Sequence, residues 1–167
     1  LGDVYKSHAG YQAALMVPTK ILAQQHFQKI TALLAPLGVS VALLTGSTKS
    51  VEREKYYQDL ANGRINVVIG TQALIQKNVK FKKLGLALID EQHRFGVRQR
   101  QALIDKGKET DFLAMTATPI PRTLALTVYG DMSVSEIHHL PSGRQPIVSR
   151  WVNSRQLSDV YRQMQTQ

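Results

Sequence analysis

Apolar and polar residues alternate in blocks along this chain. Short apolar runs of strand length are separated by longer stretches in which apolar positions recur every three or four residues. The first pattern predicts buried strands and the second predicts amphipathic helices. The predicted strands are residues 13–17, 39–44, 65–69, 84–89 and 111–115, and the predicted helices are residues 19–34, 50–62 and 97–105.

Strands that alternate with helices imply right-handed βαβ units, and so a parallel sheet with helices on both faces. Residues 84–89 are almost wholly apolar, as in strands buried on both faces of such a sheet. Ser50 is predicted to cap the second helix, with Glu52 and Glu54 in its first turn, and Gly63 to end it. The predicted fold class is therefore α/β.

The regular alternation ends after a predicted helix at residues 123–129. Residues 133–140 are predicted to form one more strand, followed by a linker that contains two prolines. A further helix is predicted at residues 155–165. We therefore expect a main domain over residues 1–146 and the start of a second domain over residues 147–167.

Composition and charge narrow the classes of function. The chain has 167 residues, 43% of them hydrophobic and 20% charged, which suits one globular domain. It contains no cysteine, which excludes disulfides and thiolate metal sites and fits a reducing cytoplasm. No apolar run reaches the length of a membrane span, so we expect no membrane partner. The net charge of +9 indicates a polyanionic partner such as nucleic acid.

Candidate chemistry lies directly after the strand at residues 84–89. Asp90 and Glu91 come together there, followed by Gln92 and His93. Ligands of open parallel sheets bind outside the carboxyl ends of the strands. A pair of carboxylates at that edge can hold a divalent ion and activate water. An Asp-Glu pair alone fits a solvated loop equally well, so the neighbouring strand ends must decide.

Polar sets follow two other predicted strands, at residues 116–118 and 18–19. Together with Asp90–His93 they resemble the nucleic-acid-dependent ATPases of helicase superfamily 2, which implies a RecA-like sheet of the P-loop NTPase type. Two longer stretches, residues 89–97 and 115–124, are similar to the RecG-type branched-DNA helicases and to the related transcription-repair coupling factors. His93 favours the RecG type.

The resemblance implies ATP and Mg²⁺ as cofactors and DNA as the partner. Asp90 would hold Mg²⁺, in part through water, and Glu91 would orient or deprotonate the water that attacks the γ-phosphate. These two and His93 are the catalytic candidates. His93 would link the nucleotide site to the coupling residues Thr116, Ala117 and Thr118. The residues that match the family's DNA-binding segments are Pro18, Thr19, Gly46, Gly70, Thr71 and Gln72.

Each candidate also has an ordinary structural interpretation. His93 can be a polar residue at a helix start, and threonines commonly cap turns and helices. The basic residues that follow or precede the site can extend an electrostatic footprint or form a solvated face. These residues are Lys77, Lys80, Lys82, Lys83, Arg94, Arg98 and Arg100.

The phosphate-binding loop is interrupted. Gly2, Asp3 and Val4 match the first three positions of G-x-x-x-x-G-K-[ST], and no Gly-Lys-Ser or Gly-Lys-Thr occurs in the chain. Too few residues separate this segment from the next strand for a parallel crossover, which needs about a dozen. We therefore expect a loop and a helix to be missing between Val4 and Tyr5, with Gly2, Asp3 and Val4 in the nucleotide site.

The resulting expectation is the first motor domain of a bacterial, cytoplasmic, nucleoid-associated helicase. It would use ATP to remodel branched DNA in recombination and repair, together with the remaining helicase domains of a longer protein. Such an isolated chain would be a poor ATPase, because in this class the second motor domain completes the nucleotide site. The alternatives are a transcription-repair coupling translocase and a non-catalytic nucleic-acid-binding module. A small-molecule α/β enzyme is disfavoured, since the chain has no dinucleotide fingerprint or nucleophile elbow.

Overall fold

The computed structural model describes residues 10–118, 133–137, 149, 151–153 and 157–165. The chain divides into two compact units, Leu1–Pro121 and Arg122–Gln167. We call the first the sheet unit, since it holds all the strands in the described part of the chain. The domain boundary expected after residue 146 falls inside the second unit and stays a prediction.

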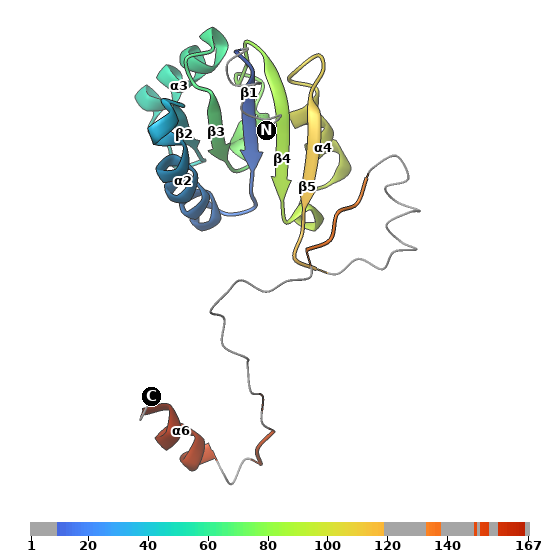
Figure 1. Ribbon diagram of the computed structural model, residues 1–167. Helices are drawn as coiled ribbons and strands as arrows, with labels where there is room; N and C mark the ends of the chain where they lie inside the picture. Colours follow the sequence, from blue (N-terminus) through green and yellow to red (C-terminus); the bar gives the residue numbers. More distant parts are fainter. Residues whose placement is uncertain (1–9, 119–132, 138–148, 150, 154–156, 166–167) are drawn as a thin grey trace. The chain divides into compact units, whose positions relative to one another are not determined.

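The sheet unit is built on five parallel strands (Figure 1). They lie in the order β2-β3-β1-β4-β5, and every neighbouring pair is parallel. All five carboxyl ends therefore meet at one edge of the sheet, as the sequence predicts. The strands are β1 (Gln12–Met16), β2 (Val41–Leu44), β3 (Val67–Gly70), β4 (Leu84–Asp90) and β5 (Asp111–Met115).

Helices connect the strands and end where the sequence carries helix signals. Thr19 caps α2 by accepting a hydrogen bond from the Leu22 amide at 3.3 Å. Gly63 ends α3 in the left-handed conformation, with φ of 75°, which glycine adopts without strain. The helices are α2 (Lys20–Leu34), α3 (Ser50–Asn62), α4 (Val97–Ile104) and α6 (Leu157–Gln165), with 3₁₀ turns η1 (Ala35–Leu37), η2 (Gln72–Ile75) and η3 (Gln92–Arg94).

The hydrophobic core has two parts, one on each face of the sheet. Successive side chains of a strand point to opposite faces. Ala14 and Met16 of β1 therefore join the cluster that holds Leu60 of α3 and Leu103 of α4. Leu15 of β1 joins the second cluster, whose helical members come from α2. Helices thus cover both faces, which confirms the RecA-like, P-loop NTPase type of fold predicted from the sequence.

The amino edge of the sheet is closed by a buried glutamine. Gln12, at the start of β1, is only 2% exposed. Its Nε2 donates to the carbonyls of Leu60 at 3.0 Å and Ile65 at 2.7 Å, and its Oε1 accepts from the Lys83 amide at 3.1 Å. One side chain therefore ties the end of α3, the approach to β3 and the approach to β4.

Two details of the predicted helices are wrong. Lys49 is the N-cap of α3 and Ser50 is its first residue, so Ser50 does not cap the helix. Glu52 lies in the first turn as predicted, whereas Glu54 falls outside it. A shift of one residue is enough to exchange a cap for a helical position, because only the residue before the first turn has a free side chain over the open amides.

The second unit carries less regular structure in its described residues. Residues 133–137 are not in a strand, although a strand was predicted over 133–140. Ile137 is 92% exposed, so it lacks the neighbouring strand that would bury it. The predicted helix at 155–165 is confirmed by α6, and the one at 123–129 lies outside the described residues. Across the described residues, no helix has the length and apolar character needed to cross a membrane.

Candidate functional site

The carboxyl edge of the sheet brings the predicted site segments to the same level. Met16, the last residue of β1, lies opposite Gly70 of β3 on one side and Ile89 of β4 on the other. The segments that follow these three strands therefore leave the sheet side by side. They contain the DNA-binding candidates after β1 and β3 and the catalytic candidates after β4.

A cleft of about 450 Å³ opens at this edge. Glu91 and His93 of the catalytic set line it together with Thr19 and Gln72 of the DNA-binding set. Two sets of residues that the sequence assigns to different ligands thus share one cavity. The lining residues are Pro18, Thr19, Leu22, Gln72, Glu91, His93, Arg94 and Phe95.

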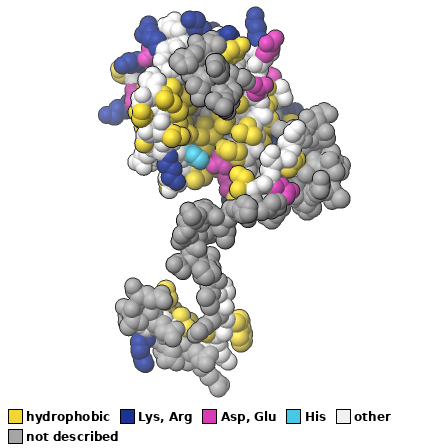
Figure 2. Space-filling view, viewed as in Figure 1, with side chains coloured by type: hydrophobic (Ala, Val, Ile, Leu, Met, Phe, Trp, Pro, Cys, Tyr) yellow, Lys and Arg dark blue, Asp and Glu magenta, His cyan; other side chains and the backbone are white. Residues whose placement is uncertain are grey.

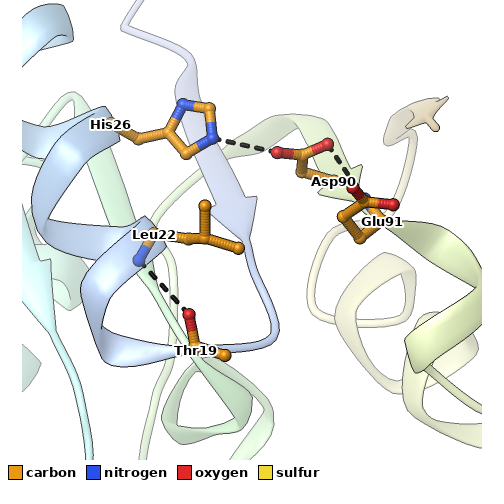
Figure 3. Close-up of polar contacts among 5 residues, drawn as sticks. All are labelled: Thr19, Leu22, His26, Asp90 and Glu91. Carbon is orange, nitrogen blue, oxygen red and sulfur yellow. Dashed lines mark hydrogen bonds and ion pairs between the residues drawn. The ribbon is translucent and has the colours of Figure 1, made fainter. Parts of the chain in front are cut away.

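The turn after β4 orients the two carboxylates. Asp90 ends the strand, and its Oδ1 accepts a hydrogen bond from the Glu91 amide at 2.9 Å (Figure 3). Glu91 has φ of 50° and ψ of 50°, which makes it the non-glycine residue with positive φ in the described part of the chain. The left-handed conformation costs about 1–2 kcal/mol for a residue with a side chain. This turn sends the chain into η3 at once, and both carboxylates stay at the edge of the sheet.

The second oxygen of Asp90 is held by a residue from another element. His26 of α2 places its Nε2 2.9 Å from Asp90 Oδ2 (Figure 3). Each side chain is partly buried, with 29% of His26 and 22% of Asp90 exposed. Nothing in the sequence signals this contact, because the two residues are 64 positions apart.

The donor set suits Mg²⁺ bound together with a phosphate ligand. Mg²⁺ prefers oxygen ligands, and in phosphate-handling sites it is held by one or two carboxylates, water and the substrate phosphates. Each Asp90 oxygen makes one hydrogen bond, and a carboxylate has about four acceptor positions, so room for a cation remains. Within the described residues, no group of three or more His, Cys, Asp or Glu side chains forms an all-protein metal cage.

His93 and the coupling residues lie near the acidic pair. His93 Nδ1 is 3.4 Å from Glu91 Oε2, and 47% of the histidine side chain is exposed. The coupling segment begins beside Asp90, because Met115 of β5 is the register partner of Asp90. Thr116 and Thr118 hydrogen-bond to each other, with Oγ1 atoms 2.6 Å apart. The described contacts contain no hydrogen bond from His93 to either threonine, so the predicted link, Ala117 included, stays a prediction.

Three DNA-binding candidates lie at the same edge but do not line the cleft. Gly46 is exposed after β2, and its carbonyl accepts a hydrogen bond from Arg53 Nη2 at 3.0 Å. Gly70 is buried, and a Cβ there would lie 2.1 Å from the Leu44 carbonyl oxygen. The close approach of β2 to β3 therefore requires glycine at this position. Thr71 donates its amide to the same carbonyl at 3.3 Å.

The basic residues separate into two groups. Lys77, Lys80, Lys82 and Lys83 precede β4 and so belong to its amino end, opposite the cleft. Lys83 places its Nζ 3.7 Å from the centre of the Tyr11 ring. Arg94, in contrast, lines the cleft. On the face shown in Figure 2, lysine and arginine side chains are spread around the sheet unit, and histidine and acidic side chains adjoin each other.

Sequence reasoning missed two buried groups near the site. His26 carries no local motif, and only its position on the same helix face as Thr19 hints at a role. Gln92 is 6% exposed, and its Oε1 has no hydrogen-bond partner among the described residues. The remaining nucleotide candidates, Gly2, Asp3 and Val4, lie outside the described residues, as does the expected break after Val4.

Comparison with known proteins identifies relatives of the whole arrangement. Residues 2–127 match the DEAD/DEAH box helicase family. The chain is 56% identical to the ATP-dependent DNA helicase RecG of Streptococcus pneumoniae over 152 residues, which are 91% of this chain and 22% of that protein. It is 52% identical to RecG of Synechocystis over 152 residues, 91% of this chain and 18% of that protein. The RecG-type resemblance is thereby confirmed, and the chain spans about a fifth of the length of these relatives.

A solved structure agrees with the sequence comparison. The structure titled RecG bound to three-way DNA junction superposes with a TM-score of 0.77 at 47% identity, covering 93% of this chain and 21% of that one. The helicase MrfA bound to DNA and AMPPNP superposes with a TM-score of 0.66 at 20% identity, covering 94% and 26% of the two chains. The second likeness concerns the fold alone.

Proposed function

The chain belongs to the DEAD/DEAH box helicase family, and we propose that it is part of the ATP-driven motor of a branched-DNA helicase. The observation that carries this proposal is the single cleft in which Glu91 and His93 meet Thr19 and Gln72. A motor must couple phosphate chemistry to its grip on DNA. A shared cavity at the carboxyl edge of a parallel sheet is suited to that coupling.

In this proposal the acidic residues act on the nucleotide. Asp90 holds Mg²⁺, which when bound neutralises charge on the β- and γ-phosphates. Glu91 orients the attacking water and accepts its proton, as a general base within the cleft. Gly2, Asp3 and Val4 belong to the loop that surrounds the phosphates. His93, Thr116, Ala117 and Thr118 relay the state of the nucleotide to the DNA-binding segments.

The DNA-binding segments track a phosphate backbone in this proposal. The exposed Thr19 stands at the N-terminus of α2, where backbone amides and the helix dipole favour an anion. Contacts of this kind position a strand without reading its sequence. Pro18 and Gln72 line the same cleft, and Arg94 adds positive charge to it. Gly46, Gly70 and Thr71 extend the track along the edge towards β2.

The choice of branched DNA follows from similarity to RecG, one of whose structures is titled as bound to a three-way DNA junction. The chain spans about a fifth of the length of its RecG relatives. Recognition of the branch and completion of the nucleotide site therefore belong, in this proposal, to further domains of a longer bacterial protein that acts at the chromosome.

Strand separation by the whole protein that contains this chain tests the proposal. A labelled three-way junction is incubated with protein and Mg²⁺, with and without ATP, beside a linear duplex of the same strand length. We expect ATP-dependent conversion of the junction and faster ATP hydrolysis when junction DNA is added. DNA binding without any DNA-stimulated hydrolysis would overturn the motor proposal and favour a non-catalytic binding module.

A further inference from the structure

A hydrogen bond joins the helix after the candidate DNA-binding loop to the carboxylate proposed to hold Mg²⁺. His26 Nε2 lies 2.9 Å from Asp90 Oδ2, with the ring pointing from α2 across to the end of β4 (Figure 3). An ionised carboxylate only accepts hydrogen bonds, so the ring nitrogen is the donor. The contact therefore fixes both the tautomer of His26 and the position of one Asp90 oxygen.

Asp90 is held at both oxygens by groups of different origin. The Glu91 amide holds Oδ1 from the adjoining peptide at 2.9 Å, and His26 holds Oδ2 from across the sheet. The terminal torsion of an aspartate is broad, so one bond alone leaves the carboxylate free to rotate. The second bond sets the plane of the carboxylate and, with it, the direction in which its remaining lone pairs point.

His26 belongs to the same helix face as the candidate phosphate contact. Thr19, Leu22 and His26 are spaced by three and four residues, which places them in one stripe along α2 (Figure 3). Thr19 Oγ1 accepts from the Leu22 amide at 3.3 Å, and Thr19 and Leu22 both line the cleft. The seven residues from Thr19 to His26 span about 10 Å of helix. Two turns of one helix thus connect the cleft entrance to Asp90.

We propose that His26 is a positioning residue that orients Asp90 for Mg²⁺ and makes α2 the mechanical link between bound DNA and the metal carboxylate. A phosphate that binds at Thr19 shifts the N-terminus of α2, and His26 transmits this shift to Asp90 Oδ2. This inference rests on the proposed function, because it assigns a regulatory connection within the same site.

Mg²⁺-dependent nucleotide binding by the whole protein tests the orienting role. Binding of a fluorescent ADP is titrated with Mg²⁺, with EDTA as the reference, for the wild type and His26→Ala. Loss of a group that orients a metal ligand typically weakens metal binding 10–100-fold, so we expect the Mg²⁺ midpoint to rise about tenfold or more. His26→Gln, whose amide nitrogen reaches the place of Nε2, should restore most of the affinity. Gln25→Ala, an exposed neighbour on α2, is the matched control.

The connecting role is read from DNA affinity at saturating Mg²⁺. Anisotropy of a labelled three-way junction gives the ratio of affinities with and without AMPPNP, and His26→Ala should bring this ratio closer to one than it is in the wild type. An unchanged Mg²⁺ midpoint in His26→Ala overturns the inference, and so does an equal loss in His26→Gln. A wild type that binds Mg²⁺ and nucleotide leaves the proposed function standing in either case, whereas one that binds neither overturns both.

Discussion

The buried Gln12 provides a stability prediction that can be worked out bond by bond. Methionine has nearly the same length and is also unbranched, so Gln12→Met keeps the packing and removes the polar atoms. The carbonyl of Leu60 retains two other donors, the amides of Gly63 at 3.1 Å and Lys82 at 3.2 Å. The carbonyl of Ile65 loses its 2.7 Å partner, and the amide of Lys83 loses the acceptor 3.1 Å away.

Two groups rather than three therefore set the magnitude. A buried polar group left without a partner costs about 1–3 kcal/mol, and the added apolar surface offsets part of that sum. We expect Gln12→Met to lower the free energy of unfolding by about 3 kcal/mol, or the Tm by about 6–12 °C for a chain of this size.

Urea unfolding followed by circular dichroism measures this difference directly. Gln25→Met is the control, since Gln25 is exposed on α2 and a surface change of this kind stays within about 0.5 kcal/mol. A loss below about 1 kcal/mol in Gln12→Met, or an equal loss in the control, would refute the reasoning that the buried amide holds the amino edge together.

Three further predictions concern stability. Gly70→Ala should cost about 3 kcal/mol, because its Cβ would lie 2.1 Å from the Leu44 carbonyl, whereas Gly46→Ala meets nothing within 4 Å; equal unfolding midpoints would contradict this. Glu91→Gly should raise the free energy of unfolding by about 0.5–1 kcal/mol through relief of the left-handed backbone, and a loss in urea unfolding would count against the strain. Burial, followed by the hydrogen bond to Glu52, raises the pKa of Tyr56 to about 12 from 10.0. The neutral phenol therefore stabilises the fold fully below pH 10, and this contribution is lost between pH 10 and 12. Urea unfolding at pH 9, 10 and 11 should show a steeper decline in the wild type than in Tyr56→Phe, and parallel declines would contradict it.

The sheet could be predicted because its apolar runs are short, separate and bounded by polar residues. Strand β5 has the bounds that the sequence predicts, and β4 extends one residue further, to Asp90. The shared cleft also follows from the sequence, since parallel strands place their carboxyl ends at one edge. Residues after β1, β3 and β4 therefore had to meet, whatever the details of their loops.

Contacts that depend on how a helix is rotated against the sheet could not be predicted. Ile21 and Leu33 have helical spacing and were expected among the apolar positions of α2, yet they are 68% and 72% exposed. The stripe that packs is narrower and includes Phe27 and Ile30. The pairing of His26 with Asp90 depends on the same rotation and joins residues far apart in the chain, so no local pattern records it.

Hydrolysis and binding of ATP by Glu91→Gln, in the whole protein with junction DNA, test the central claim most directly. Glutamine keeps the size of the side chain and the backbone conformation but cannot accept the proton from water. General-base catalysis contributes about 10²–10⁴-fold, so we expect the hydrolysis rate to fall by at least about 100-fold while ATP binding changes little. Undiminished hydrolysis in Glu91→Gln would contradict the assignment of this cleft as the site of ATP chemistry.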